Sequence, residues 1–170
     1  MVNVRRWFRH LFMPPWAWRR AFPQATLDAV EDAVRESETR HSGEIRFAIE
    51  NSLVPSRVWR GMTGRERAVE IFSSLHVWDT EHNSGVLIYL LLADRDIEIV
   101  ADRGIAARVA PAVWEQVAQA MEAAFRNGQF EQGALDGIAR ISGLLAEHFP
   151  PTGHNPDELA NRPVRVPRGR

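Results

Sequence analysis

The apolar stretch Val86–Ala93 constrains the fold more than any other part of the chain. Eight consecutive apolar residues are typical of a strand that is covered on both faces. A polar loop, 79–85, precedes the stretch, and the turn-forming sequence Asp94-Arg95-Asp96 follows it. Residues 97–101 then alternate apolar and polar, as in a strand with one wetter face. The sequence therefore predicts a central antiparallel hairpin.

The flanking segments predict a small mixed sheet packed by helices. Thr63-Gly64-Arg65-Glu66 is a capping box, and it opens a helix that runs to about residue 78. The other predicted elements, by helical or alternating spacing, are a helix over 24–40, a strand over 44–50, a helix from Pro111 to the Asn127-Gly128 stop, and a last helix ending at Pro150. This order predicts an α/β fold in one domain over 24–150. A basic aromatic arm (1–23) precedes it, and a basic tail (151–170) with the composition of a disordered segment follows.

Charge is distributed unevenly along the 170 residues. The formal net charge is −1, but residues 1–20 carry +5 and residues 151–170 carry +2, which leaves −8 for the part between them. An acidic body with basic ends is a poor candidate for a nucleic-acid-binding fold, so no nucleic acid is expected as a partner. The chain has no cysteine, which excludes disulfides and thiolate chemistry. It also has no apolar run long enough for a transmembrane helix.

The arm interleaves arginines with aromatic residues and is interrupted by Pro14-Pro15. One interpretation is that its aromatic side chains pack onto the domain or onto a second copy. The alternative is contact with an anionic membrane surface or a membrane-associated protein, because aromatic rings and cations favour the headgroup region. The residues that would make such contacts are Arg5, Arg6, Trp7, Trp16, Trp18, Arg19 and Arg20.

Carboxylates collect at one end of the predicted hairpin. Asp79 and Glu81 lie in the loop before the first strand, and Asp102 follows the second. In an antiparallel pair, these two chain segments meet at the same edge of the sheet. Oxygen ligands of this kind suit Ca²⁺ or Mg²⁺, so the three acids are the predicted metal ligands. The alternative is that they cap turns and helix ends, for which aspartate is equally common.

Several segments resemble the TPM domain family. They are Asn83-Ser84-Gly85-Val86-Leu87-Ile88, Asp94 to Ile99, Arg103-Gly104-Ile105, Ser42 to Ile45, and Phe125-Arg126-Asn127-Gly128-Gln129-Phe130, and they span roughly residues 25–149. The resemblance implies a three-layer α/β/α sandwich around a short mixed sheet. Plant members from the thylakoid lumen are described as acid phosphatases, and some bacterial members bind divalent cations.

The resemblance implies a possible phosphatase activity, and the chain also departs from the family pattern. A metal-assisted phosphatase would use Asp79, Glu81 and Asp102, with Arg103 to steer the phosphate. His82 is the histidine nearest this loop and is the candidate for acid–base work; the alternative is a solvent-exposed loop histidine. Exported members usually have Gly-x-Gly-Leu-Glu after the hairpin, whereas this chain has Asp102 and Ala106 at the first and last of those positions. It also lacks their signal peptide and C-terminal membrane helix, so it resembles an intracellular branch.

From these observations we expect a TPM-like module that binds a divalent cation or a partner. It would act in the cytoplasm, at the inner face of a membrane. The alternatives are a phosphatase-like hydrolase that uses Ca²⁺ or Mg²⁺, and a scaffold that self-associates through the arm.

Overall fold

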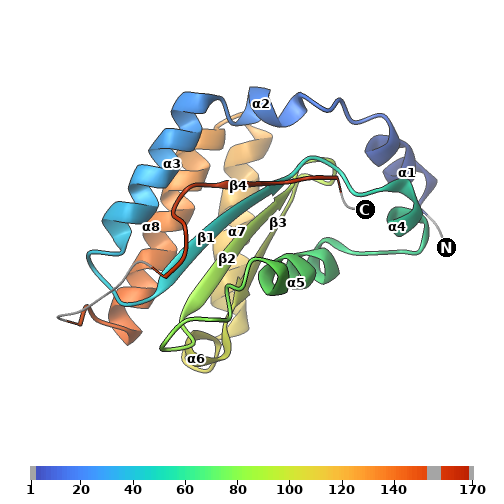
Figure 1. The fold of residues 1–170 in the computed structure, drawn as a ribbon. Coiled ribbons are helices and arrows are strands. Elements are labelled where there is room, and N and C mark those ends of the chain that lie inside the picture. Colours follow the sequence, from blue (N-terminus) through green and yellow to red (C-terminus); the bar gives the residue numbers. More distant parts are fainter. Residues whose placement is uncertain (1–2, 153–157, 169–170) are drawn as a thin grey trace.

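The computed structural model describes residues 3–152 and 158–168 (Figure 1). The predicted hairpin is confirmed: β2 spans Gly85–Leu91 and β3 spans Asp96–Ala101. The remaining elements are α1 (Val4–Leu11), α2 (Ala17–Ala21), α3 (Gln24–Ser37), β1 (Glu44–Glu50), α4 (Pro55–Trp59), α5 (Gly64–Ser74), α6 (Arg103–Ala106), α7 (Pro111–Arg126), α8 (Phe130–His148) and β4 (Val164–Val166).

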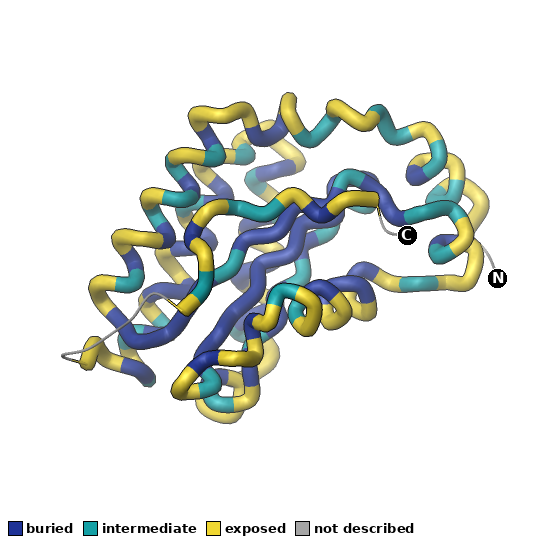
Figure 2. The backbone as a smooth tube through the Cα atoms, viewed as in Figure 1, coloured by how far each residue is buried: buried dark blue, intermediate teal, exposed yellow. Residues whose placement is uncertain are grey.

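The four described strands form one mixed sheet in the order β3-β2-β1-β4. β1 is parallel to β2, with Ile45 opposite Val86, and β2 is antiparallel to β3, with Ile88 opposite Ile99. All seven residues of β2 are buried, as expected for a strand between two neighbours and two helical layers. Figure 2 shows this buried centre with exposed residues on the outer helices.

Helices cover both faces of the sheet, which confirms the α/β prediction. The face that carries Ile45, Phe47 and Ile88 packs against α3, α7 and α8, and Figure 1 shows these helices together on that side. The opposite face, with Leu87 and Tyr89, packs against α4 and α5. The capping box of α5 is present: Thr63 accepts a hydrogen bond from Glu66 N–H, and the Glu66 carboxylate accepts one from Thr63 N–H. No helix in the described residues has both the length and the hydropathy needed to cross a bilayer.

A buried ionic network lies in the α5 layer. The Glu50 carboxylate is fully buried and accepts two hydrogen bonds from the Arg67 guanidinium, at 2.9 and 3.2 Å. It also accepts one from the Tyr89 hydroxyl at 2.7 Å. Arg67 in turn donates to Glu70, at 2.7 Å. The network ties the end of β1 to β2 and to α5.

The prediction of a disordered tail is wrong for residues 164–166. These residues form β4, which pairs in parallel with β1 through Ala48↔Val164 and Glu50↔Val166. Val166 is buried in the α5-side core, and the Arg165 guanidinium lies 5.2 Å from the centre of the Trp18 ring. The edge of β1 would otherwise be open, and its backbone groups pair with those of residues 164–166. The composition of the tail gives no sign of this pairing. Residues 153–157 and 169–170 of the tail lie outside the described residues.

Candidate functional site

The first candidate site is the sheet edge where β2 begins and β3 ends. The predicted adjacency of the two segments is confirmed by three contacts: Asp102 N–H donates to Gly85 O at 2.8 Å, Gly104 N–H donates to Asn83 O at 3.0 Å, and Arg103 Nε donates to Asn83 Oδ1 at 3.1 Å. The approach is close, because a Cβ on Gly104 would lie 2.6 Å from the carbonyl oxygens of His82 and Asn83. Arg103 is therefore held against the loop that precedes β2.

The three predicted metal ligands differ in their surroundings. Asp102 is buried and caps α6, where its Oδ1 accepts a hydrogen bond from Arg103 N–H at 2.7 Å. Asp79 and Glu81 are exposed, as is the candidate acid–base residue His82. Within the described residues, no group of three or more His, Asp or Glu side chains is arranged to hold a metal ion. A cation that combines Asp102 with backbone oxygens remains a prediction.

The tail adds the carboxylate of Glu158 to this edge, which sequence reasoning missed. The Glu158 carboxylate accepts a hydrogen bond from Glu81 N–H at 3.2 Å. The backbone N–H groups of Glu158 and Leu159 donate to the buried Glu44 carboxylate, at 3.4 and 3.3 Å. No signal in the sequence pairs the tail with this loop or with β1, because the contacting residues lie 77 and 114 positions apart.

The second candidate site is the arm, and the structure divides its predicted contact residues into two groups. Arg6 donates from Nε and Nη2 to Asp94 Oδ2, at 2.9 and 2.8 Å, and Trp7 packs edge-on against Trp59. Trp18 is partly buried against the main core. These three therefore hold the arm on the domain, as the packing interpretation expected. The remaining four predicted residues, Arg5, Trp16, Arg19 and Arg20, are exposed.

Asp94 is the anchor of the arm, beyond its role in the turn between β2 and β3. Besides Arg6, its carboxylate contacts Arg9 at 3.2 Å and the buried His10 ring at 3.0 Å. Burial alone would raise the pKa of Asp94, but the hydrogen bonds from His10 and Arg6 outweigh it and lower the pKa to about 2. The other nitrogen of the His10 ring, Nδ1, accepts a hydrogen bond from Leu53 N–H at 3.0 Å. The first helix is thus fixed to the hairpin at neutral pH.

Exposed apolar side chains lie along one side of α1 and, after Pro14-Pro15, at the start of α2. Phe8 and Phe12 are one helical turn apart, and their rings stack with centroids 5.9 Å apart and planes within 3°. Val4, Phe8, Phe12 and Trp16 remain 55%, 48%, 71% and 58% exposed. We call these four residues, with the exposed Arg5, Arg9, Arg19 and Arg20, the arm surface. Burial of such a row would release water from apolar area, which is typical of an interaction surface.

Comparison with known proteins identifies the family of this chain. A family profile described as the TPM domain matches residues 19–144. Among solved structures, the NMR structure of the BA42 protein from the psychrophilic bacterium Bizionia argentinensis is similar, with a TM-score of 0.74 and 32% sequence identity. That similarity covers 84% of this chain and 93% of the BA42 chain. The comparison with curated proteins gives no match. The chain belongs to the TPM domain family.

Proposed function

We propose that this protein is a TPM module that binds an anionic membrane surface through the arm surface. The observation that carries the proposal is the exposed row Val4, Phe8 and Phe12 on α1, with the exposed Trp16 before α2 and exposed arginines on both helices. A helix with an apolar face and arginines beside it lies at the boundary of headgroups and acyl chains, where both groups find favourable surroundings. The arm is suited to this because its inner contacts with Asp94 fix α1 and leave the row facing outward.

Sedimentation with lipid vesicles tests the proposal. Vesicles of phosphatidylcholine with added phosphatidylglycerol should bind the protein, and vesicles of phosphatidylcholine alone should bind it less, because arginines are attracted to anionic lipid. The double variant Phe8→Ser/Phe12→Ser should lose most of the binding. Val69→Ser is the matched control, since Val69 is also exposed (46%) but lies on α5. Equal binding by the double variant and the control would refute the proposal.

The same variants address the alternative that the arm mediates self-association. Sedimentation velocity of the wild-type chain without lipid would then show a dimer that dissociates in Phe8→Ser/Phe12→Ser. A wild-type monomer that still binds anionic vesicles would favour the membrane and exclude the scaffold.

A second candidate function is divalent-cation binding at Asp102. The observation that favours it is the other carboxylate oxygen, Oδ2, which is buried and has no hydrogen-bond partner among the described residues. A buried carboxylate oxygen without a donor is costly, and a cation would compensate that cost. Thermal melts with and without Ca²⁺ or Mg²⁺ test this, because a ligand that binds only the folded state raises the midpoint. The rise should disappear in Asp102→Asn, and a midpoint that neither ion changes would refute the cation site.

Metal-assisted phosphatase activity depends on the same carboxylate. A phosphatase would lose turnover of a phosphate ester in Asp102→Asn while it keeps the wild-type circular dichroism spectrum. Turnover that is equal in the variant and in the wild type would exclude Asp102 as a catalytic residue.

A further inference from the structure

β3 lies at one end of the sheet and leaves a row of backbone groups without a neighbouring strand in the described residues. The register shows which residues face outward. Asp102 N–H donates to Gly85 O, so the hydrogen-bonded pairs with β2 fall on every second residue counted back from Asp102. The N–H and C=O groups of Ile97, Ile99 and Ala101 therefore point away from β2 and towards the open edge.

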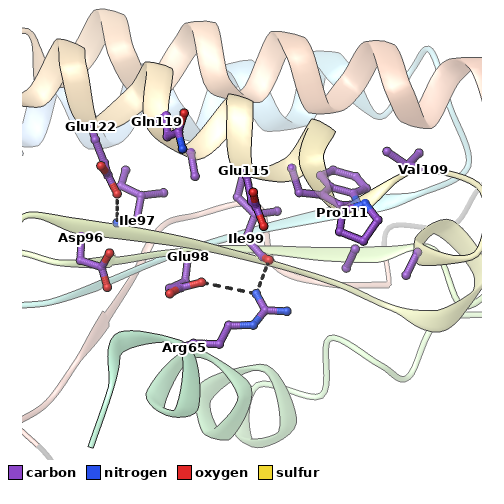
Figure 3. Close-up of a pocket in the computed structure, with 14 residues that line it drawn as sticks. Arg65, Asp96, Ile97, Glu98, Ile99, Val109, Pro111, Glu115, Gln119 and Glu122 are labelled. Carbon is purple, nitrogen blue, oxygen red and sulfur yellow. Dashed lines mark hydrogen bonds and ion pairs between the residues drawn. The ribbon is translucent and has the colours of Figure 1, made fainter.

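Two charged side chains occupy part of this edge (Figure 3). From α7, Glu122 Oε1 accepts a hydrogen bond from Ile97 N–H at 3.3 Å. From α5, Arg65 Nη1 donates to Ile99 O at 2.6 Å and lies 3.5 Å from the Glu98 carboxylate. Both contacts use backbone groups that a neighbouring strand would otherwise pair. The Arg65 side chain is 53% exposed, so it can turn aside without leaving a buried space.

The open edge forms the floor of a groove between α5 and α7. The groove has a volume of about 570 Å³. Its apolar lining includes Ile97, Ile99 and Trp114. Its charged lining is strongly unbalanced, because the single guanidinium of Arg65 faces four carboxylates, those of Asp96, Glu98, Glu115 and Glu122.

Two of the groove carboxylates, those of Asp96 and Glu98, have a raised pKa. Burial raises the pKa of Asp96, and the charges of Glu122 and Asp94 raise it further. Burial likewise raises the pKa of Glu98, with Asp96 adding to the effect against the opposing charge of Arg65. Half-buried acids that repel one another gain stability when a cationic group enters between them.

We propose that the β3 edge binds an extended, basic segment of a partner protein as an additional strand. The outward N–H and C=O groups of Ile97, Ile99 and Ala101 would pair with the backbone of that segment, and arginine or lysine side chains would meet the groove carboxylates. Charge complementarity selects this occupant. Pairing of β3 with β3 of a second copy would place the acids of one groove against those of the other, which is unfavourable. The proposal is independent of lipid or cation binding.

The probe for this site is the blocked peptide Arg-Val-Arg-Val-Arg-Val-Arg, followed by ¹⁵N chemical shifts of the full chain. We expect the largest shifts at the amides of Ile97, Ile99 and Ala101, and slower hydrogen exchange at Ile99. A peptide of the same sequence with alternate backbone nitrogens methylated keeps the charge but removes half of its donors. It should bind at least about tenfold more weakly, because strand addition depends on main-chain hydrogen bonds. Equal affinity for both peptides would overturn the proposal.

Protein variants test the charge part of the site. Glu98→Gln/Glu115→Gln removes two groove carboxylates and should weaken peptide binding about tenfold or more at low salt. Glu36→Gln is the matched control, since Glu36 is an exposed acid on α3. Unchanged affinity in the double variant, or shifts centred away from β3, would overturn the proposal. A wild-type dimer whose interface shifts fall on β3 without any peptide would also overturn it, in favour of a second copy as the occupant.

Discussion

Removal of Arg67 from the buried network should strongly destabilise the protein. In Arg67→Met the aliphatic volume is largely kept, but the Glu50 carboxylate loses two of its three hydrogen bonds. Glu50 is 0% exposed, so water cannot replace the guanidinium. Only the Tyr89 hydroxyl would still donate to it.

The expected cost follows from the burial of both partners. The Arg67 side chain is 9% exposed, which places the pair among buried ion pairs rather than surface ones. Loss of one partner from such a pair costs roughly 3–5 kcal/mol, because the remaining charge is buried without compensation. For a chain of this length that corresponds to a decrease in the melting temperature of about 6–20 °C. Arg35→Met is the control: Arg35 pairs with Glu31 and Asp32 but is 58% exposed, so the cost should stay below about 1 kcal/mol.

Urea denaturation followed by circular dichroism measures both free energies of unfolding. The double variant Glu50→Gln/Arg67→Met should recover part of the loss. A cost for Arg67→Met within about 1 kcal/mol of the control would refute this account of the network.

Three further predictions concern the arm, a buried histidine and two glycines. Asp94→Asn should speed hydrogen exchange of the α1 amides about 5- to 100-fold at neutral pH, because it removes charge-assisted hydrogen bonds worth roughly 1–3 kcal/mol. In the wild type, the contribution of these Asp94 contacts to stability should decrease only as the pH falls from about 3.8 towards about 2. The pKa of His41 is lowered to about 4, mainly by burial. The free energy of unfolding should therefore decrease as the pH falls from 6.5 to 4, because the unfolded chain takes up a proton in that range. The urea midpoint of His41→Asn should depend less on pH in that range than the midpoint of the wild type. Gly143 is an exposed residue of α8 where a Cβ would meet nothing within 4 Å, so Gly143→Ala should stabilise the protein by about 1 kcal/mol. A Cβ at Gly85 would lie 2.0 Å from a backbone carbonyl oxygen, so Gly85→Ala should strongly destabilise it. Urea midpoints that rank the two glycine variants the other way would contradict this.

The sequence predicts those parts of the fold that depend on local patterns. The uninterrupted run Val86–Ala93 predicts a buried central strand because eight apolar residues between turn signals have the length of a strand that is covered on both faces. The capping box at Thr63 predicts the start of α5 because both partners lie within one turn of helix. β4 is not predictable in this way. Three residues between Pro163 and Pro167 carry too little periodicity, and only the open edge of β1 makes them a strand.

The candidate site is less predictable, because its key contacts join residues far apart in the chain. The meeting of the loop before β2 with Asp102 follows from hairpin topology and is confirmed. The ion pair of Arg6 with Asp94 joins residues 88 positions apart. Composition alone therefore did not decide whether the arm packs on the domain or remains exposed. The structure shows that both descriptions apply to different residues of the arm, since α1 buries His10 and leaves Phe12 exposed.

The contact between the two chain ends has a consequence for synthesis on the ribosome. Arg168 donates from Nη2 to the carbonyl oxygen of His10 at 2.6 Å, so a residue of α1 is held by one that is translated 158 positions later. Translation proceeds at roughly 5–20 residues per second, so Arg168 is synthesised about ten seconds or more after α1. During this interval the aromatic side chains of the arm are available to chaperones or to nearby lipid. The arm can therefore meet its surroundings before the domain that holds it is complete.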